Sequence, residues 1–198
     1  MSYKRIEAKP EIRILGVDDG PFNKNHEKTF LICTIFRGGL WLDGLLATKI
    51  TVDGLDATQK LIEVINKSNH KEQLRVIMLD GITYAGFNVM DIEEIYKNTN
   101  LPVIVVMRDK PNFKKIRKAL FNNFKDAEIR WRMIQKAGEI YKVAVRPAKY
   151  IYIQTKGIYL EDAINITRLS ATRSLIPEPI RVAHIIARGV GLENCIKN

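Results

Sequence analysis

The chain has 198 residues and a formal net charge of +10, from 32 Lys and Arg against 22 Asp and Glu. This length and a 46% hydrophobic content fit one large domain with its own core. The absence of any apolar run of about 18 residues argues against a membrane span, and the first residues lack the apolar centre of a signal peptide. The positive charge favours an anionic partner, nucleic acid above all.

The first elements are predicted to be a strand and a hairpin. Residues 12–17 form an apolar run that ends on the adjacent Asp18 and Asp19. Residues 29–50 contain two β-rich runs separated by Gly38-Gly39, which is typical of a hairpin. The second and third strands are therefore expected to be antiparallel.

The middle of the chain alternates helices and strands. Residues 56–68 carry apolar side chains at helical spacing, with Asp56 as a candidate N-cap, and residues 90–99 form a second helix opened by Asp91. The apolar runs 75–80 and 101–107 follow these two helical patterns in the chain and are typical of buried strands.

The last part is predicted to be mostly helical. Residues 110–137 are basic and form two amphipathic helices, 150–155 suit a further strand, and 159–172 and 178–190 form two closing helices. Apolar strands separated by helices pair in parallel, whereas the early hairpin is antiparallel. We therefore expect one α/β domain over residues 1–198. Its mixed sheet is antiparallel in strands one to three and parallel afterwards, with helices on both faces.

Two carboxylates follow apolar strands of the same type. Asp18 ends the first strand and Asp80 ends the run 75–80. If the strands are neighbours, both side chains meet at one edge of the sheet, where a cation would relieve their repulsion. Oxygen ligands of this kind suit Mg²⁺ or Mn²⁺. Asp-Gly is also a common turn dipeptide, so a turn and a metal site both remain open.

Other polar residues offer weaker candidates. Asp53 and Asp56 lie before a helix and could add a metal ligand, although capping suits Asp56 better. The basic helices could bind phosphate, or their aromatic side chains could face the core while the charges are solvated. The candidate phosphate-binding residues there are Lys114, Lys115, Arg117, Lys118, Arg130 and Arg132. Cys33 and Cys195 are too few for a disulfide framework, which favours the cytoplasm.

Four motifs resemble a known family. The run Pro177-Glu178-Pro179-x-Arg181-x-Ala183-His184 resembles the C-terminal motif of endonuclease V, a nuclease with a ribonuclease H-like fold. The stretches VDDGPF, VDGLDAT and DGITYAGFNV more closely resemble its archaeal relatives, an uncharacterised group described as domain of unknown function family 99. The resemblance covers nearly the whole chain.

The resemblance implies roles for particular residues. It places the metal-binding aspartates on Asp18 and Asp80, with Asp19 as a helper or second ligand, and the ion is expected to be Mg²⁺ or Mn²⁺. The third metal-site position falls on His184, which helix spacing alone would assign to a half-buried position. Arg181 of the same motif is expected to contact nucleic acid.

The chain also departs from the family pattern. Endonuclease V has a glutamate in a Phe-Arg-Glu segment, whereas Gly38 follows Phe36-Arg37 here, so Asp56 is the nearest substitute and Asp53 the second. The family's Pro-Tyr-Ile-Pro wedge has no match, and inosine recognition does not carry over. We therefore expect a divalent-metal-dependent nuclease acting on DNA or RNA. A catalytically inactive nucleic-acid-binding protein is the alternative, and a small-molecule phosphoesterase is a third interpretation.

Overall fold

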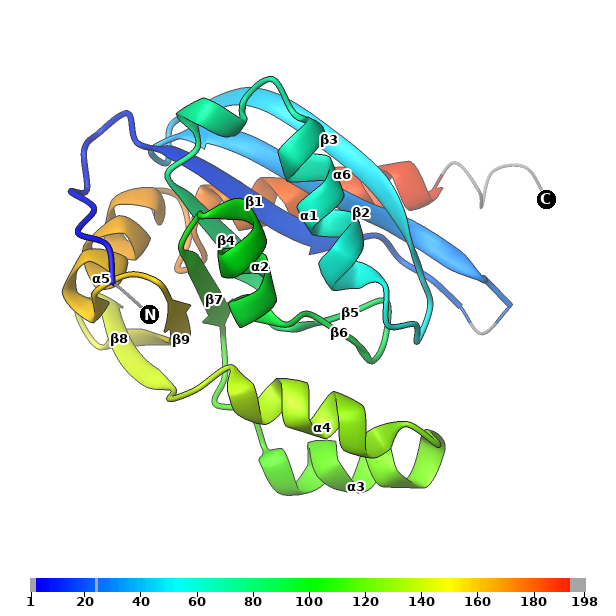
Figure 1. Cartoon of the computed structure of the whole chain (residues 1–198). Coiled ribbons are helices and arrows are strands. Elements are labelled where there is room, and N and C mark those ends of the chain that lie inside the picture. The colour runs from blue at the N-terminus through cyan, green and yellow to red at the C-terminus, as the bar shows by residue number, and fades with distance from the viewer. Residues whose placement is uncertain (1–2, 24, 193–198) are drawn as a thin grey trace.

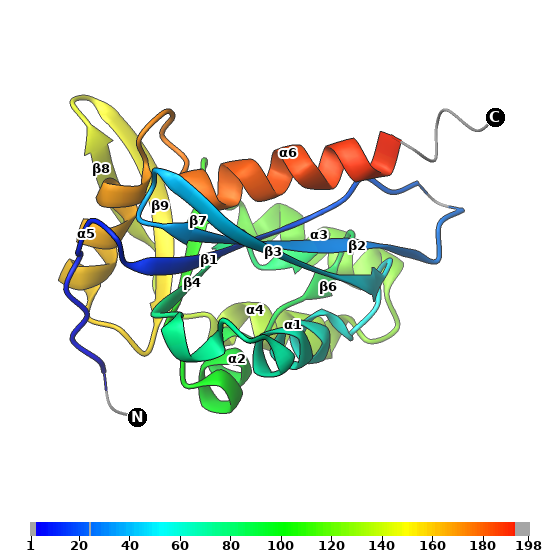
Figure 2. The same cartoon turned by 90° about the horizontal axis from the view of Figure 1, so that it is seen from above.

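The computed structural model describes residues 3–23 and 25–192. One seven-stranded sheet forms its centre, in the order β3-β2-β1-β4-β7-β9-β8, and helices cover both faces (Figures 1 and 2). Its strands are β1 (Arg13–Asp19), β2 (Lys28–Arg37), β3 (Trp41–Thr51), β4 (Val76–Asp80), β7 (Val103–Met107), β8 (Tyr141–Arg146) and β9 (Lys149–Lys156). A small hairpin consists of β5 (Thr83–Tyr84) and β6 (Asn88–Val89). The helices are α1 (Ala57–Lys67), η1 (Lys71–Gln73), α2 (Ile92–Thr99), α3 (Phe113–Asn123), α4 (Ala127–Lys136), α5 (Leu160–Ser170) and α6 (Glu178–Leu192).

The pairing of the strands confirms the predicted mixed sheet. Strand β2 is antiparallel to both of its neighbours, β1 and β3, and β1, β4 and β7 are parallel. The prediction of parallel strands to the end of the sheet is wrong for the last two, because β9 is antiparallel to β7 and β8 is antiparallel to β9. Of these two strands only β9 was predicted. The sequence did not reveal β8 because the turn between β8 and β9 is short and contains no glycine. Its positive φ of 56° is adopted by Ala148, a residue type that does not signal such a turn.

Two predicted helix starts have different outcomes. Asp91 caps α2, since its side chain accepts hydrogen bonds from the backbone N–H groups of Glu93 and Glu94. Asp56 occupies the N-cap position of α1 but makes no capping hydrogen bond, so the predicted capping role is wrong. The side chain of Asn88 accepts from the N–H of Ala57 instead.

Two hydrophobic layers hold the sheet between them. Leu15 and Val17 of β1 contribute to the layer that α1 and α2 cover, whereas Ile14 of the same strand contributes to the opposite layer. This alternation follows from the two-residue period of a strand. Helix α6 lies across β1 and β2 on the second face (Figure 2).

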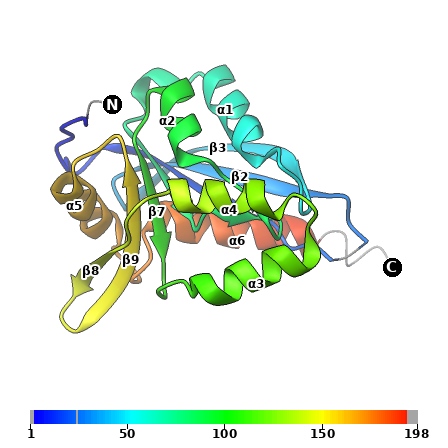
Figure 3. The same cartoon turned by 60° about the horizontal axis from the view of Figure 1, so that its bottom comes forward.

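Helices α3 and α4 form a separate hairpin after β7 (Figures 1 and 3).

In the described part of the chain, none of the helices is long and apolar enough to cross a membrane. Cys33 is buried in β2, and Cys195 lies outside the described residues.

Candidate metal centre

Asp18 and Asp80 lie at the carboxyl ends of two neighbouring parallel strands, Asp18 one residue before the end of β1 and Asp80 at the end of β4, and they project from the same face of the sheet. Val17 of β1 pairs with Leu79 of β4, and both belong to the layer under α1 and α2. The next residue in each strand therefore points to the opposite face, toward α6. The sheet thus places both carboxylates together at the carboxyl end of its strands, where α/β proteins commonly bind ligands.

Helix α6 brings His184 to these carboxylates. The helix approaches β1 closely because Gly16 has no side chain, and a Cβ there would overlap the backbone of Pro179. Thr34 fixes the contact, since its hydroxyl donates to the carbonyl of Pro179 at 2.6 Å. One atom from each of Asp18, Asp80 and His184 then lies within 4.8 Å of the others, and Nδ1 of His184 is 2.6 Å from Oδ2 of Asp18.

The electrostatics of this cluster are those of a site with excess negative charge. Burial and, after it, the nearby charge of Asp80 raise the pKa of Asp18 to about 7, against the hydrogen bond from the backbone N–H of Asp19. Burial also raises the pKa of Asp80, which the positive charge of Arg108 and the charge of His184 counteract. Two carboxylates and an imidazole are a donor set that Mg²⁺ or Mn²⁺ accepts, and a cation there would remove the cost of holding both carboxylates ionised.

Arg108 was missed by the sequence analysis. Arg108 directly follows Met107, the last residue of β7, and is exposed. It therefore lies at the carboxyl end of its strand, as Asp18 and Asp80 do in β1 and β4. Val106 packs on the α6 side, so Arg108 has the parity of that face. The signal was available in the sequence, because a polar residue directly after a buried parallel strand lies at the same edge as the carboxylates.

Asp19 points to the other face of the sheet. Its Oδ2 accepts a hydrogen bond of 2.6 Å from the backbone N–H of Ala85, which lies between β5 and β6. Burial raises its pKa, and this hydrogen bond opposes the shift. The side chain therefore braces the turn at Ala85, a residue with a positive φ of 44°, and is not part of the three-residue cluster.

Asp53 and Asp56 are also engaged away from the cluster. Asp56 accepts hydrogen bonds from the backbone and hydroxyl of Thr51 and from the side chain of Asn88. Burial would raise the pKa of Asp56, but these hydrogen bonds hold it below its usual value. Oδ1 of Asp53 accepts from the backbone N–H of Phe87. The structure thus gives no geometric support to either residue as the substitute for the family glutamate.

The predicted nucleic-acid-binding residues divide into two groups. Lys114, Lys115, Arg117 and Lys118 are exposed on α3. Arg181 instead forms an ion pair with the buried Glu178, with Nε and Nη2 2.8 and 2.7 Å from its two carboxylate oxygens. This pair occupies the guanidinium edge that would otherwise meet a phosphate, so Arg181 has a structural partner that the sequence did not reveal.

Comparisons with known proteins identify the family of this chain. Residues 10–191 match the model of the Endonuclease dU family. A UPF0215 protein from Methanothermobacter thermautotrophicus is 54% identical over 187 residues, which cover 94% of this chain and 91% of that protein. The crystal structure of a protein of unknown function from Archaeoglobus fulgidus has a TM-score of 0.81 and 38% identity, covering 90% of this chain and 98% of the other.

More distant structures share the fold. Endonuclease V from Bacillus subtilis has a TM-score of 0.69 at 13% identity, covering 100% of this chain and 88% of that one. Ciona intestinalis endonuclease V, solved with a DNA containing an inosine, has a TM-score of 0.62 at 16% identity, covering 93% and 87%. At such identities the likeness is one of fold alone. The match over residues 10–191 and the UPF0215 relative establish that the chain belongs to the Endonuclease dU family of archaeal proteins, with the fold of endonuclease V.

Proposed function

We propose that this protein is a divalent-metal-dependent nuclease that hydrolyses phosphodiester bonds of DNA or RNA. The observation that carries the proposal is the convergence of Asp18, Asp80 and His184, whose ligand atoms lie within 4.8 Å of one another. The family and the endonuclease V fold support the reaction class. The net charge of +10 supports a polyanionic substrate.

The residues of the cluster have distinct roles in this proposal. Asp18 and Asp80 hold Mg²⁺ or Mn²⁺, and such an ion supplies an activated water and stabilises negative charge on a phosphate. His184 fixes the orientation of Asp18 through the 2.6 Å contact between its Nδ1 and Oδ2 of Asp18. The other ring nitrogen, Nε2, takes no part in this contact. Arg108 presents a cation beside Asp80, where phosphate charge develops. Asp19 positions the Ala85 turn beneath the site.

The exposed lysines and arginine of α3 are the proposed first contacts with the nucleic-acid backbone. Lys114, Lys115 and Lys118 form no ion pair in the described part of the chain, and Arg117 lies 4.6 Å over the ring of Phe121. A patch of unpaired cations attracts a polyanion without reading its sequence.

One observation favours a second function. Among the described residues, the candidate cluster contains two carboxylates and one imidazole, and Asp53 and Asp56 are held elsewhere by hydrogen bonds. A protein that lost a third carboxylate and kept the fold would bind nucleic acid without cutting it. The test below separates the two functions.

The test is cleavage of labelled single- and double-stranded DNA and RNA with Mn²⁺ by the native chain, by Asp18→Asn and by Asp80→Asn. We expect each substitution to reduce cleavage by at least about a hundredfold, because each removes a charged metal ligand. Asp109→Asn is the matched control, since Asp109 is an exposed carboxylate near the carboxyl end of β7 outside the cluster. Cleavage that survives both cluster substitutions contradicts the proposal, and binding without cleavage by the native chain supports the second function.

A further inference from the structure

The direction of α6 defines which of its residues lie beyond the metal centre. Pro179 packs on Gly16, and the carbonyl of Ala187 lies 3.3 Å from the position of a Cβ on Gly20. The helix therefore follows β1 in the same direction, from the middle of the strand past its carboxyl end (Figure 2). Residues after Ala187 extend further in this direction.

The two flanks of α6 face different strands. His184 points toward Asp18 and Asp80, on the β4 side, whereas Ile186 packs with Phe30 and Ile32 of β2. Arg188 is four residues after His184 and so lies on the same flank, about 6 Å further along the helix. This position is outside the carboxyl end of β4, next to the cluster.

Among residues 3–23 and 25–192, no carboxylate neutralises Arg188. It is exposed, and the described residues offer it neither an ion pair nor a side-chain hydrogen bond. Arg181, on the previous turns of the same helix, is held by Glu178. Arg108 approaches the cluster from the other side, at the end of β7. Two exposed arginines thus flank the cluster in the fold, Arg108 directly after β7 and Arg188 one helical turn after His184 on α6.

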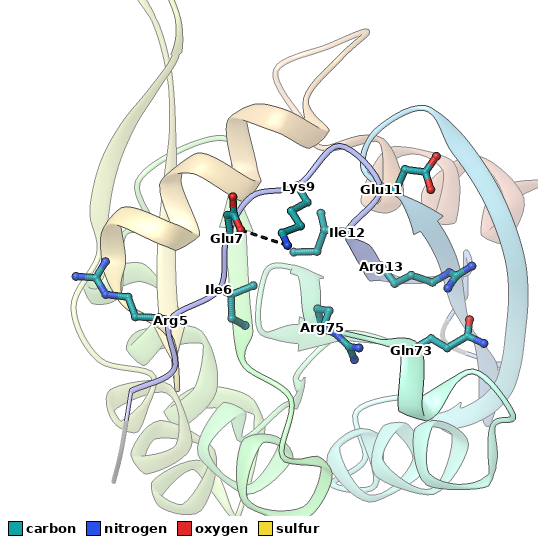
Figure 4. A pocket seen from close by; sticks show the side chains of 9 residues that line it. All are labelled: Arg5, Ile6, Glu7, Lys9, Glu11, Ile12, Arg13, Gln73 and Arg75. Carbon is teal, nitrogen blue, oxygen red and sulfur yellow. Dashed lines mark ion pairs between the residues drawn. The ribbon is translucent and has the colours of Figure 1, made fainter.

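A second group of cations, at the opposite end of the sheet, is mostly neutralised. A pocket of about 520 Å³ lies beside the amino ends of β1 and β4 (Figure 4). Its Arg13 is paired with Asp43, its Arg5 with Asp162 and its Lys9 with Glu7. Arg75 there donates only to backbone carbonyls. The paired cations of this pocket can therefore be compared with the unpaired Arg188 beside the candidate metal centre.

We propose that Arg188 is a phosphate-binding residue that holds the backbone of the nucleic acid next to the bond at the metal centre. The proposal deepens the proposed nuclease function and rests on it for the identity of the ligand. A guanidinium binds a backbone phosphate through charge-assisted hydrogen bonds, independently of base sequence. Arg188 and Arg108 then fix the strand on both sides of the carboxylates.

The test is binding of a labelled single strand in the presence of EDTA, measured by fluorescence anisotropy from about 50 to 200 mM salt. We expect Arg188→Ala to weaken binding about three- to tenfold and to reduce the slope of log K against log salt by roughly 0.7, the value for one phosphate contact. Arg188→Lys should retain most of the slope because it retains the charge. Unchanged thermal unfolding of Arg188→Ala would show that the fold is intact.

The matched control is Arg75→Ala, which removes an exposed arginine from the pocket in Figure 4. An unchanged salt slope for Arg188→Ala, or a loss for Arg75→Ala alone, overturns the proposal. The measurement needs no metal, so its outcome is separate from that of the cleavage test. A native chain that shows the Arg188-dependent slope but does not cut with Mn²⁺ would retain this inference and lose the nuclease function.

Discussion

Two aspartate-rich segments follow strands of the same sheet and behave in opposite ways. Asp18 follows the apolar run of β1, and its burial, together with the nearby charge of Asp80, raises its pKa to about 7. Asp56 follows β3, and hydrogen bonds from Thr51 and Asn88 lower its pKa. The folded protein therefore disfavours the negative charge of Asp18 and favours that of Asp56. The difference teaches that an aspartate motif indicates a ligand site only where the fold leaves the charge uncompensated.

The largest expected effect on stability concerns Arg130, which holds the backbone of the segment that contains Asp53 and Asp56. Arg130 is 4% exposed, donates to the backbone carbonyls of Asp53, Gly54 and Phe87, and pairs with Asp126. We expect Arg130→Met to lower the free energy of unfolding by about 3–5 kcal/mol, because Asp126 and the carbonyls lose their donor. Urea unfolding followed by circular dichroism measures this. Arg132→Met, which removes an exposed pair with Glu128, should change stability by less than about 0.5 kcal/mol.

A smaller effect is expected at the carboxylate itself. Asp56→Ala leaves the N–H of Thr51 and the amide of Asn88 without their acceptor, so we expect a loss of about 1–3 kcal/mol in the same urea experiment. Mn²⁺ affinity, measured by calorimetry, should not change. A variant with native stability and weakened Mn²⁺ binding would place Asp56 in the metal centre and remove the contrast between the two segments.

The smallest effect has the opposite sign. The folded protein keeps the Asp18 proton up to about pH 7, whereas the unfolded chain loses it near the ordinary value of 3.8. The folded state therefore binds more protons in this window, and its stability falls as the pH rises from about 4 to 7. In EDTA at pH 8 we expect Asp18→Asn to be more stable than the native chain by roughly 1–2 kcal/mol.

This difference should disappear near pH 5, where Asp18 of the folded native chain is protonated. Thermal unfolding of both proteins at the two pH values measures it. Mn²⁺ should then stabilise the native chain and not the variant, since only the native chain binds the ion with both carboxylates. A variant that is less stable than the native chain at pH 8 would show that the charge of Asp18 is compensated without metal.

Local sequence patterns predicted the parts of the molecule that depend on local physics. The apolar runs ending on Asp18 and Asp80 predicted buried parallel strands, because burial on both faces requires continuous hydrophobic strands. That these two strands are neighbours was left open by the sequence and is shown by their pairing. The position of His184 beside them came from a resemblance and not from helix spacing, which describes only one helix at a time. The parity of Asp19 follows from the period of a strand, yet its partner, the N–H of Ala85, is 66 residues away.

The remaining differences arise from contacts across long sequence separations. Arg130 lies in a basic, amphipathic stretch for which phosphate binding and a solvated charge are the two predictions, and the structure contradicts both for this residue. Its side chain is buried and donates to the carbonyl of Asp53, 77 residues before it. Asn88 reaches Asp56 from 32 residues away and takes over the role that a capping motif predicts. No periodicity encodes such pairs, because the unsatisfied groups appear only when the strands have assembled.

The close contact between Gly16 and Pro179 makes the cluster of Asp18, Asp80 and His184 dependent on the docking of α6. Asp18 and His184 are separated by 166 residues, so a growing polypeptide carries both aspartates long before the imidazole exists. Until α6 docks, the face of β1 and β2 around Ile32 stays uncovered and the imidazole is missing from the cluster. A nascent chain thus presents the two carboxylates alone, and the three-residue cluster is complete only when the C-terminal helix has packed on the sheet.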